Sequence, residues 1–266
     1  MLAKERQDKI NAILKKNGAV MTSDLVERFQ VSVETVRRDL LLMEQKGILS
    51  RVHGGAVIVG EMEAFHDLDY RNQKYSVQKR ELVATAASFV REGDYIGIDS
   101  GSTAILFAEA LKDRYHNLTI VTHSMDVFEH LRDSRDFKII LCGGFYLREE
   151  RAFYGSPTLD MLGGLHLQKA FIFPSAISLE FGICDFQPEL FQVQKKMKSV
   201  SDSIFIAADS SKFEKKALLK LDDMRQEYTY ITDSNLPSEL KKIYAENDRN
   251  VYNGTDSHHS KSTMAH

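Results

Sequence analysis

Residues 32–40 read Ser-Val-Glu-Thr-Val-Arg-Arg-Asp-Leu, and this stretch decides the fold of the N-terminal part of the chain. Ser32 is a residue type that commonly caps the start of a helix. The apolar residues that follow it return every three or four positions, at Val33, Val36, Leu40 and Met43. This spacing predicts a helix with one buried side. Four polar residues fall on its opposite, wet side: Glu34, Thr35, Arg37 and Arg38.

Two further helices are predicted before this one, and a hairpin after it. Residues 2–16 carry apolar residues at helical spacing, and Thr22 or Ser23 can cap a short helix that ends at Phe29. Residues 48–59 read as two short strands that turn on Gly54-Gly55. Three helices followed by a two-stranded wing predict a winged helix-turn-helix fold.

The exposed side of the third helix carries chemistry suited to DNA. In helix-turn-helix proteins the N-terminal end of this helix enters the major groove, where arginine can bind guanine or phosphate. Alternatively, Arg37 and Arg38 are solvated charges paired with Glu34 or Asp39. The order of helix, cap and wing favours DNA contact. The predicted DNA-binding residues are Thr22, Ser32, Glu34, Thr35, Arg37, Arg38, Arg51 and His53.

The charge of the chain is unevenly distributed. Its net charge is -3, but residues 1–57 hold ten Lys or Arg against seven Asp or Glu, which gives +3 and leaves -6 for the remainder. A basic N-terminal part on an acidic body is compatible with DNA contact through that part alone.

Beyond about residue 79, apolar runs of strand length alternate with amphipathic runs of helix length. Predicted strands are 95–98, 118–121, 138–141, 170–173, 204–207 and 228–231, and predicted helices are 103–111, 125–131, 158–162, 190–200 and 238–244. This alternation predicts an α/β domain with a mostly parallel, Rossmann-like sheet covered by helices on both faces.

Small and hydroxylated residues follow several of these strands, where open α/β sheets bind ligands. Residues 99–103 read Asp-Ser-Gly-Ser-Thr between a strand and a helix, which is compatible with a phosphate cradle or with a tight turn alone. The spacing excludes a Gly-x-Ser-x-Gly nucleophile elbow, and the chain has neither a P-loop nor a Gly-x-Gly-x-x-Gly dinucleotide motif. His123 has no evident catalytic partner.

The N-terminal pattern also resembles a known family. Arg6, Ile10 and Leu14, followed after a gap by residues 32–40 and by the wing at 48–56, are similar to the signature of DeoR-type bacterial transcriptional repressors. The resemblance continues through residues 99–103, 122–124, 143–144, 153–155 and 208–213, and covers nearly all of residues 1–235. It implies a sensor domain that resembles sugar-phosphate isomerases, binds phosphorylated sugars or related metabolites, and releases DNA when loaded.

Two positions depart from the family pattern. Residues 173–178 read Phe-Pro-Ser-Ala-Ile-Ser where the family usually has a Gly-rich acidic turn, and Gln194 stands where many relatives place Lys. The predicted effector-binding residues are Asp99, Ser100, Gly101, Ser102, Thr103, Thr122, His123, Ser124, Gly143, Gly144, Arg148, Ser175, Lys195, Asp209 and Lys212.

We therefore predict a winged DNA-binding domain at 1–57, a linker at 58–78, an effector-sensor and oligomerisation domain at 79–246 and a disordered tail at 247–266. The predicted function is a cytoplasmic, homo-oligomeric repressor of a carbohydrate-utilisation operon. Its expected partners are operator DNA and a phosphorylated sugar, with no membrane partner, cofactor, metal or catalytic residue. An isomerase or deaminase that carries a DNA-binding head is the alternative, and an activator would use the same binding chemistry.

Overall fold

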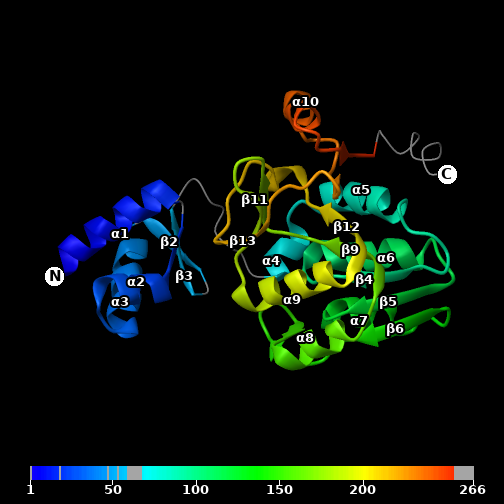
Figure 1. Cartoon of the computed structure of the whole chain (residues 1–266), viewed down its shortest axis with the longest axis horizontal. Helices are drawn as coiled ribbons and strands as arrows, with labels where there is room; N and C mark the ends of the chain where they lie inside the picture. The colour runs from blue at the N-terminus through cyan, green and yellow to red at the C-terminus, as the bar shows by residue number, and fades with distance from the viewer. Residues whose placement is uncertain (1, 18, 47, 53, 59–67, 255–266) are drawn as a thin grey trace.

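The computed structural model describes residues 2–17, 19–46, 48–52, 54–58 and 68–254 (Figure 1). Within these ranges, a small N-terminal unit and a larger α/β unit are distinct (Figure 1). His53, most of the predicted linker and residues 255–266 of the predicted tail lie outside the described residues. The predicted domain boundaries stay a prediction.

The N-terminal unit is a winged helix-turn-helix. Its helices are α1 (Ala3–Asn17), α2 (Thr22–Phe29) and α3 (Val33–Gln45). Its wing is formed by β2 (Leu49–Val52) and β3 (Gly55–Ile58), and β1 (Ala19–Met21) adds a third strand against β3 that the sequence pattern did not predict. Ile10, Leu14, Leu25, Val36, Leu40 and Met43 are buried together in its core. Val33 is the exception to the predicted apolar side, because it is the first residue of α3 and remains 42% exposed.

A buried ion pair joins the first and third helices. The Arg6 guanidinium donates to Asp39, and Gln7 Nε2 donates to the other oxygen of the same carboxylate at 3.0 Å. Both charged side chains are more than 90% buried. Asp39 therefore pairs with α1 and is not a partner of Arg37 or Arg38.

The α/β unit is built on a seven-stranded parallel sheet in the order β15-β14-β12-β9-β4-β5-β6. The strands are β4 (Tyr95–Ile98), β5 (Leu118–Thr122), β6 (Phe137–Leu141), β9 (Leu167–Ile172), β12 (Ser201–Ala207), β14 (Thr229–Ile231) and β15 (Val251–Tyr252). All six pairings are parallel, so the predicted sheet is confirmed.

Helices cover both faces of this sheet and create two apolar cores. One core contains residues of α5 (Ser76–Ala87), α6 (Ser102–Lys112) and α7 (Met125–Leu131). The other contains residues of α8 (Ser156–Gly163), α9 (Pro188–Ser199) and α10 (Ser238–Glu246). No helix in the described part of the chain is both long enough and apolar enough to cross a membrane.

The strand order places a crevice next to β4. From β4 the chain runs through α6 to β5 and through α7 to β6 on one side, whereas β9 pairs with the other side of β4. The direction of strand addition thus reverses at β4, and ligands of open α/β sheets bind outside the carboxyl ends of the strands at such a reversal.

Shorter elements surround this crevice. They are the helix α4 (Leu68–Gln73), the hairpin of β7 (Phe145–Leu147) and β8 (Ala152–Tyr154), and an antiparallel sheet of β10 (Ala176–Ser178), β11 (Gly182–Asp185) and β13 (Leu219–Asp222). A 3-10 turn, η1 (Ser210–Lys212), follows β12.

We expect Asp39→Ala to destabilise the N-terminal unit by about 3–5 kcal/mol, because it leaves the buried Arg6 charge without its carboxylate. Hydrogen-exchange mass spectrometry on the full chain would measure this as lost protection in α1 and α3. Glu34→Ala is the matched control on the same helix, because its pair with Arg37 is exposed on both sides. Equal protection in the two variants would contradict a structural role for the buried pair.

Candidate functional site

The exposed side of α3 presents two arginines in different states. Arg37 pairs with Glu34 at 2.9 Å, and this pair is largely exposed. Arg38 is also exposed, and its side chain forms no hydrogen bond or ion pair with another described residue. Ser32 accepts a hydrogen bond from the Thr35 N–H at 3.2 Å, so the predicted helix cap is confirmed. Arg38 thus has the guanidinium group that is available to DNA on this helix.

The wing and the start of α2 place the other predicted DNA-binding residues. Arg51 donates through its Nε to Glu44 at 2.7 Å, and its backbone N–H donates to the same carboxylate. The prediction that Thr22 or Ser23 caps α2 is wrong. The strand β1 runs directly into the helix, so Met21 occupies the cap position and the Thr22 N–H donates to the Gly54 carbonyl at 2.7 Å.

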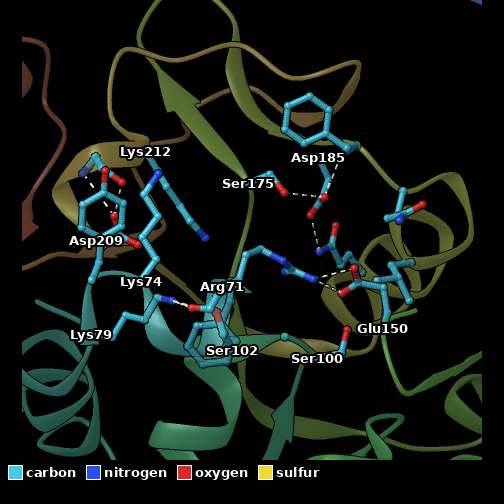
Figure 2. A pocket seen from close by; sticks show the side chains of 18 residues that line it. Arg71, Lys74, Lys79, Ser100, Ser102, Glu150, Ser175, Asp185, Asp209 and Lys212 are labelled. Carbon is cyan, nitrogen blue, oxygen red and sulfur yellow. Dashed lines mark hydrogen bonds and ion pairs between the residues drawn. The ribbon is translucent and has the colours of Figure 1, made fainter. Parts of the chain in front are cut away.

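A pocket lies at the carboxyl ends of β4, β9 and β12, where the sheet reverses (Figure 2). It encloses about 770 Å³ of space that no atom fills, part of which is open to solvent. The lining residues are Arg71, Lys74, Tyr75, Lys79, Ser100, Gly101, Ser102, Glu150, Phe173, Ser175, Asp185, Phe186, Gln187, Leu190, Gln194, Asp209, Ser211 and Lys212.

One side of the pocket is rich in ammonium groups; we call it the cationic end, formed by Lys74, Lys79 and Lys212 with Ser102 and Asp209. Lys79 Nζ donates to the Ser102 hydroxyl at 2.9 Å and to the Arg71 carbonyl, and Lys212 Nζ donates to the Pro174 carbonyl at 3.0 Å. The three lysines are labelled together in Figure 2. Each ammonium has three N–H donors, so these contacts leave hydrogen-bonding capacity for an anion.

The start of α6 allows close approach to this end. Gly101 has a φ of 102°, a backbone angle that residues with a side chain rarely adopt. A Cβ at this position would lie 3.6 Å from the Arg71 guanidinium. Ser102 then begins α6, whose N-terminus favours anions.

The opposite side, which we call the carboxylate end, contains Asp185, Gln187, Gln194 and Ser175. Gln194 Nε2 donates to Asp185 at 2.8 Å and to the deeper carboxylate of Asp99 at 3.0 Å. The Ser175 hydroxyl donates to Asp185 at 2.8 Å. Figure 2 shows Asp185 and Ser175 across the pocket from the three lysines.

Arg71 extends between the two ends and pairs with Glu150. Its Nη2 donates to both carboxylate oxygens at 2.5 and 2.6 Å, and Glu150 is 1% exposed (Figure 2). Burial raises the pKa of Glu150, and the Arg71 charge opposes that effect.

Burial also shifts the pKa values of the groups at each end. At the cationic end, burial and the neighbouring Lys212 lower the pKa of Lys79 to about 8, although Asp209 opposes them. At the carboxylate end, burial raises the pKa of Asp185, and nearby Asp99 adds to the rise. Each end thus holds buried charge that its own surroundings compensate incompletely.

Six of the predicted effector-binding residues line the pocket: Ser100, Gly101, Ser102, Ser175, Asp209 and Lys212. Asp99 lies directly beneath it. The Asp99 carboxylate accepts hydrogen bonds from the Phe173 N–H at 3.2 Å and from Gln194, and it lies 3.1 Å from His123 Nε2. Thr103 is buried in the first turn of α6.

The remaining predicted residues are not brought to the pocket. The hydroxyl of Thr122 accepts from the Ser124 N–H, Ser124 caps α7, and His123 is fully buried between Asp99 and the Phe153 carbonyl. The Gly143 carbonyl accepts from Thr158, and Gly144 packs against the same residue. Arg148 is exposed, and Lys195 lies over the Phe191 ring on the exposed side of α9.

Sequence reasoning missed the pocket residues that precede residue 79. Arg71, Lys74 and Tyr75 fall in the predicted linker, where the sequence shows no clear periodicity. It also missed Asp185, whose strand β11 is too short to leave an alternating pattern. The concentration of Arg71, Lys74 and Lys79 within nine residues was an available signal.

Comparison with known proteins decides the family. The model of the DeoR C terminal sensor domain matches residues 74–234, and the model of the DeoR-like helix-turn-helix domain matches residues 6–61. The chain belongs to the DeoR family. It is thus a DNA-binding transcriptional regulator, and the predicted resemblance is confirmed.

Three DeoR-family relatives are similar along most of their length. The chain is 31% identical to the uncharacterized HTH-type transcriptional regulator YulB of Bacillus subtilis, over 91% of this chain and 94% of that protein. It is 31% identical to the L-fucose operon activator of Haemophilus influenzae, over 91% and 97%. It is 29% identical to the glycerol-3-phosphate regulon repressor of the same organism, over 86% and 89%.

One solved structure with a partly similar fold shares less sequence with this DeoR-family chain than these relatives do. Ribose 5 phosphate isomerase A from Neisseria gonorrhoeae is 21% identical with a TM-score of 0.41, over 57% of each chain.

The matched DeoR sensor model begins at residue 74, so Arg71 lies just before it and Lys74 at its first position.

We expect Arg38→Ala to weaken DNA binding about 5–150-fold, which corresponds to the ~1–3 kcal/mol of one good base or phosphate contact. The probe is double-stranded DNA that the wild-type chain selects from a random pool, and binding is measured by fluorescence anisotropy. Lys242→Ala on exposed α10 is the control for the loss of one positive charge. Wild-type affinity in the Arg38 variant would remove Arg38 from the DNA contacts.

Proposed function

We propose that this DeoR-family regulator is a repressor whose pocket binds a phosphorylated sugar or a related phosphate ester, and that the bound ester releases the operator. The observation that carries the proposal is the cationic end, where three buried or half-buried lysines line the pocket and Lys79 donates to the Ser102 hydroxyl at the N-terminus of α6. A helix N-terminus with ammonium groups and hydroxyls is suited to a phosphate dianion.

The names of two relatives support a carbohydrate role. One controls an L-fucose operon and the other a glycerol-3-phosphate regulon, and the two are named activator and repressor respectively. The relatives reported above are regulators, and a regulatory role is therefore also proposed for the pocket itself. We further propose that the chain acts as a homo-oligomer whose heads bind half-sites ~34 Å, or a multiple of that, apart.

Arg71 gives the pocket a route to the DNA-binding unit. It belongs to α4, the first described element after residues 59–67, which connect the two units. A phosphate in the pocket competes with Glu150 for the Arg71 guanidinium. Such competition would favour a different position of α4, and a ligand that binds that arrangement more tightly shifts the equilibrium toward it.

The direct test is a thermal-shift screen of phosphate esters of sugars and polyols, with each hit retested for release of the selected DNA. We expect ~2.7 kcal/mol of stabilisation at a ligand concentration 100 times Kd, and a ~5–150-fold loss of DNA affinity at saturation. In Arg71→Ala, saturating ligand should lower DNA affinity by a smaller factor than in the wild-type chain. In Arg80→Ala, on the exposed side of α5, it should lower DNA affinity by the wild-type factor. A chain that no phosphate ester or inorganic phosphate stabilises would overturn the proposal.

The pKa of Lys79 predicts how phosphate binding depends on pH. The charged ammonium is present below about pH 8 and is lost as the pH rises, while a phosphate ester is already dianionic above about pH 7. If phosphate binds the charged form, affinity should fall about tenfold between pH 7 and pH 9. Isothermal titration calorimetry would measure this fall, together with proton uptake near pH 8.

Two variants separate Lys79 from other groups in that experiment. Lys79→Arg keeps its charge throughout this pH range and should flatten the profile. Lys195→Arg, at an exposed lysine outside the pocket, should leave the profile unchanged. A flat profile in the wild-type chain would show that Lys79 is not the phosphate ligand.

A further inference from the structure

The carboxylate end holds a buried acidic side chain, Asp185, for which the described contacts provide only neutral donors. Asp185 accepts from the Ser175 hydroxyl, from the Phe186 N–H at 2.7 Å and from the Gln194 amide. The same amide nitrogen uses its second hydrogen on Asp99, so Gln194 bridges two buried carboxylates without adding positive charge. A buried carboxylate without an opposite charge is costly.

The guanidinium of Arg71, in the same pocket, binds a different carboxylate. Arg71 donates to both oxygens of Glu150, which is itself buried. Among the described residues, the ammonium groups that line the pocket lie at the cationic end, beside Ser102 and Asp209. The two ends thus differ in charge, and a ligand that spans them meets opposite fields.

Two acceptor atoms at the carboxylate end also have no donor. Gln194 Oε1 and Gln187 Oε1 are buried and have no hydrogen-bond partner among the described residues, although both side chains line the pocket. Their residues are 2% and 4% exposed. The Gln194 amide orientation is fixed, because its nitrogen must face the two carboxylates. A buried acceptor of this kind needs a donor from the ligand.

Ligand groups differ in how well they meet these needs. A hydroxyl offers one donor and no charge, whereas a primary ammonium offers three donors and a positive charge. Asp185, Gln187 and Gln194 provide a carboxylate and two free acceptors. An ammonium therefore satisfies the donor requirement and the charge requirement together.

We infer that the effector carries a primary ammonium group in addition to its phosphate, as an amino-sugar phosphate does, and that Asp185, Gln187 and Gln194 bind this ammonium. The inference rests on the proposed phosphate-binding function of the opposite end. It narrows the class of effector proposed for that pocket from phosphate esters in general to phosphorylated amines.

Matched ligand pairs test the inference by isothermal titration calorimetry at pH 6.5. The pairs are glucosamine 6-phosphate with glucose 6-phosphate, and galactosamine 6-phosphate with galactose 6-phosphate, and inorganic phosphate is measured alongside. We expect at least one amine to bind tenfold or more tightly than its hydroxyl partner. The corresponding N-acetyl ester, which keeps the nitrogen but loses its charge, should lose that advantage.

Variants at the carboxylate end connect the preference to these residues. Asp185→Asn keeps the shape and removes the charge, and Gln194→Lys places a fixed ammonium between the two carboxylates. Both should reduce the ratio of amine to hydroxyl affinity to about one. Asp202→Asn, at an exposed aspartate on β12, is the matched control and should keep the wild-type ratio.

The outcomes separate this inference from the proposed function. Amines that bind no more tightly than their hydroxyl partners overturn the ammonium site, as does binding of inorganic phosphate with no binding of either partner, and both leave the phosphate proposal standing. An amine preference that persists in both variants also overturns the assignment to Asp185 and Gln194. Absence of binding by every phosphate compound overturns both proposals.

Discussion

The carboxylate of Asp99 connects the chain segments that form the floor of the pocket. It lies at the end of the central strand β4 and receives hydrogen bonds from the Phe173 N–H after β9 and from Gln194 on α9. On its other side it lies 3.1 Å from His123, which follows β5. These contacts cross the point where the sheet reverses direction, and so they fix the positions of the strand ends that carry the pocket residues.

This arrangement explains why several of the residues that the sequence predicted together line one pocket. Residues at the carboxyl ends of parallel strands meet at one edge of the sheet, and the strands were recognisable from their apolar runs. The sequence alone therefore predicted that four of the lining residues lie close together: Ser100, Ser102, Asp209 and Lys212. Thr122 and Ser124 share the same edge but are used locally, since one orients a backbone N–H and the other caps α7. Sequence position alone does not separate these two uses of a hydroxyl.

The other part of the site comes from elements that leave weak patterns. The helix α4 spans only Leu68–Gln73, and β11 spans only Gly182–Asp185, so neither is long enough for a clear hydrophobic period. Asp185, the last residue of β11, was not among the residues that the sequence predicted for the site. In the structure it lies in the pocket, but at the end opposite the lysines. Arg148 and Lys195 illustrate the converse, because a charge close to the pocket in sequence can lie on the outward side of its own element.

The pocket contains charged groups that are only partly compensated by their surroundings. Lys79 and Asp185 are both more than 90% buried, and the surroundings of each disfavour its charged form. A ligand with groups complementary to both ends would remove these two penalties at once. Such a ligand would bind more tightly to a conformation in which both ends contact it than to one in which only one end does. Arg71 lies between the ends, where its guanidinium donates to both oxygens of Glu150. Because Arg71 belongs to α4, the first described element after residues 59–67, the pocket charges act on a short helix that follows the DNA-binding unit in the chain.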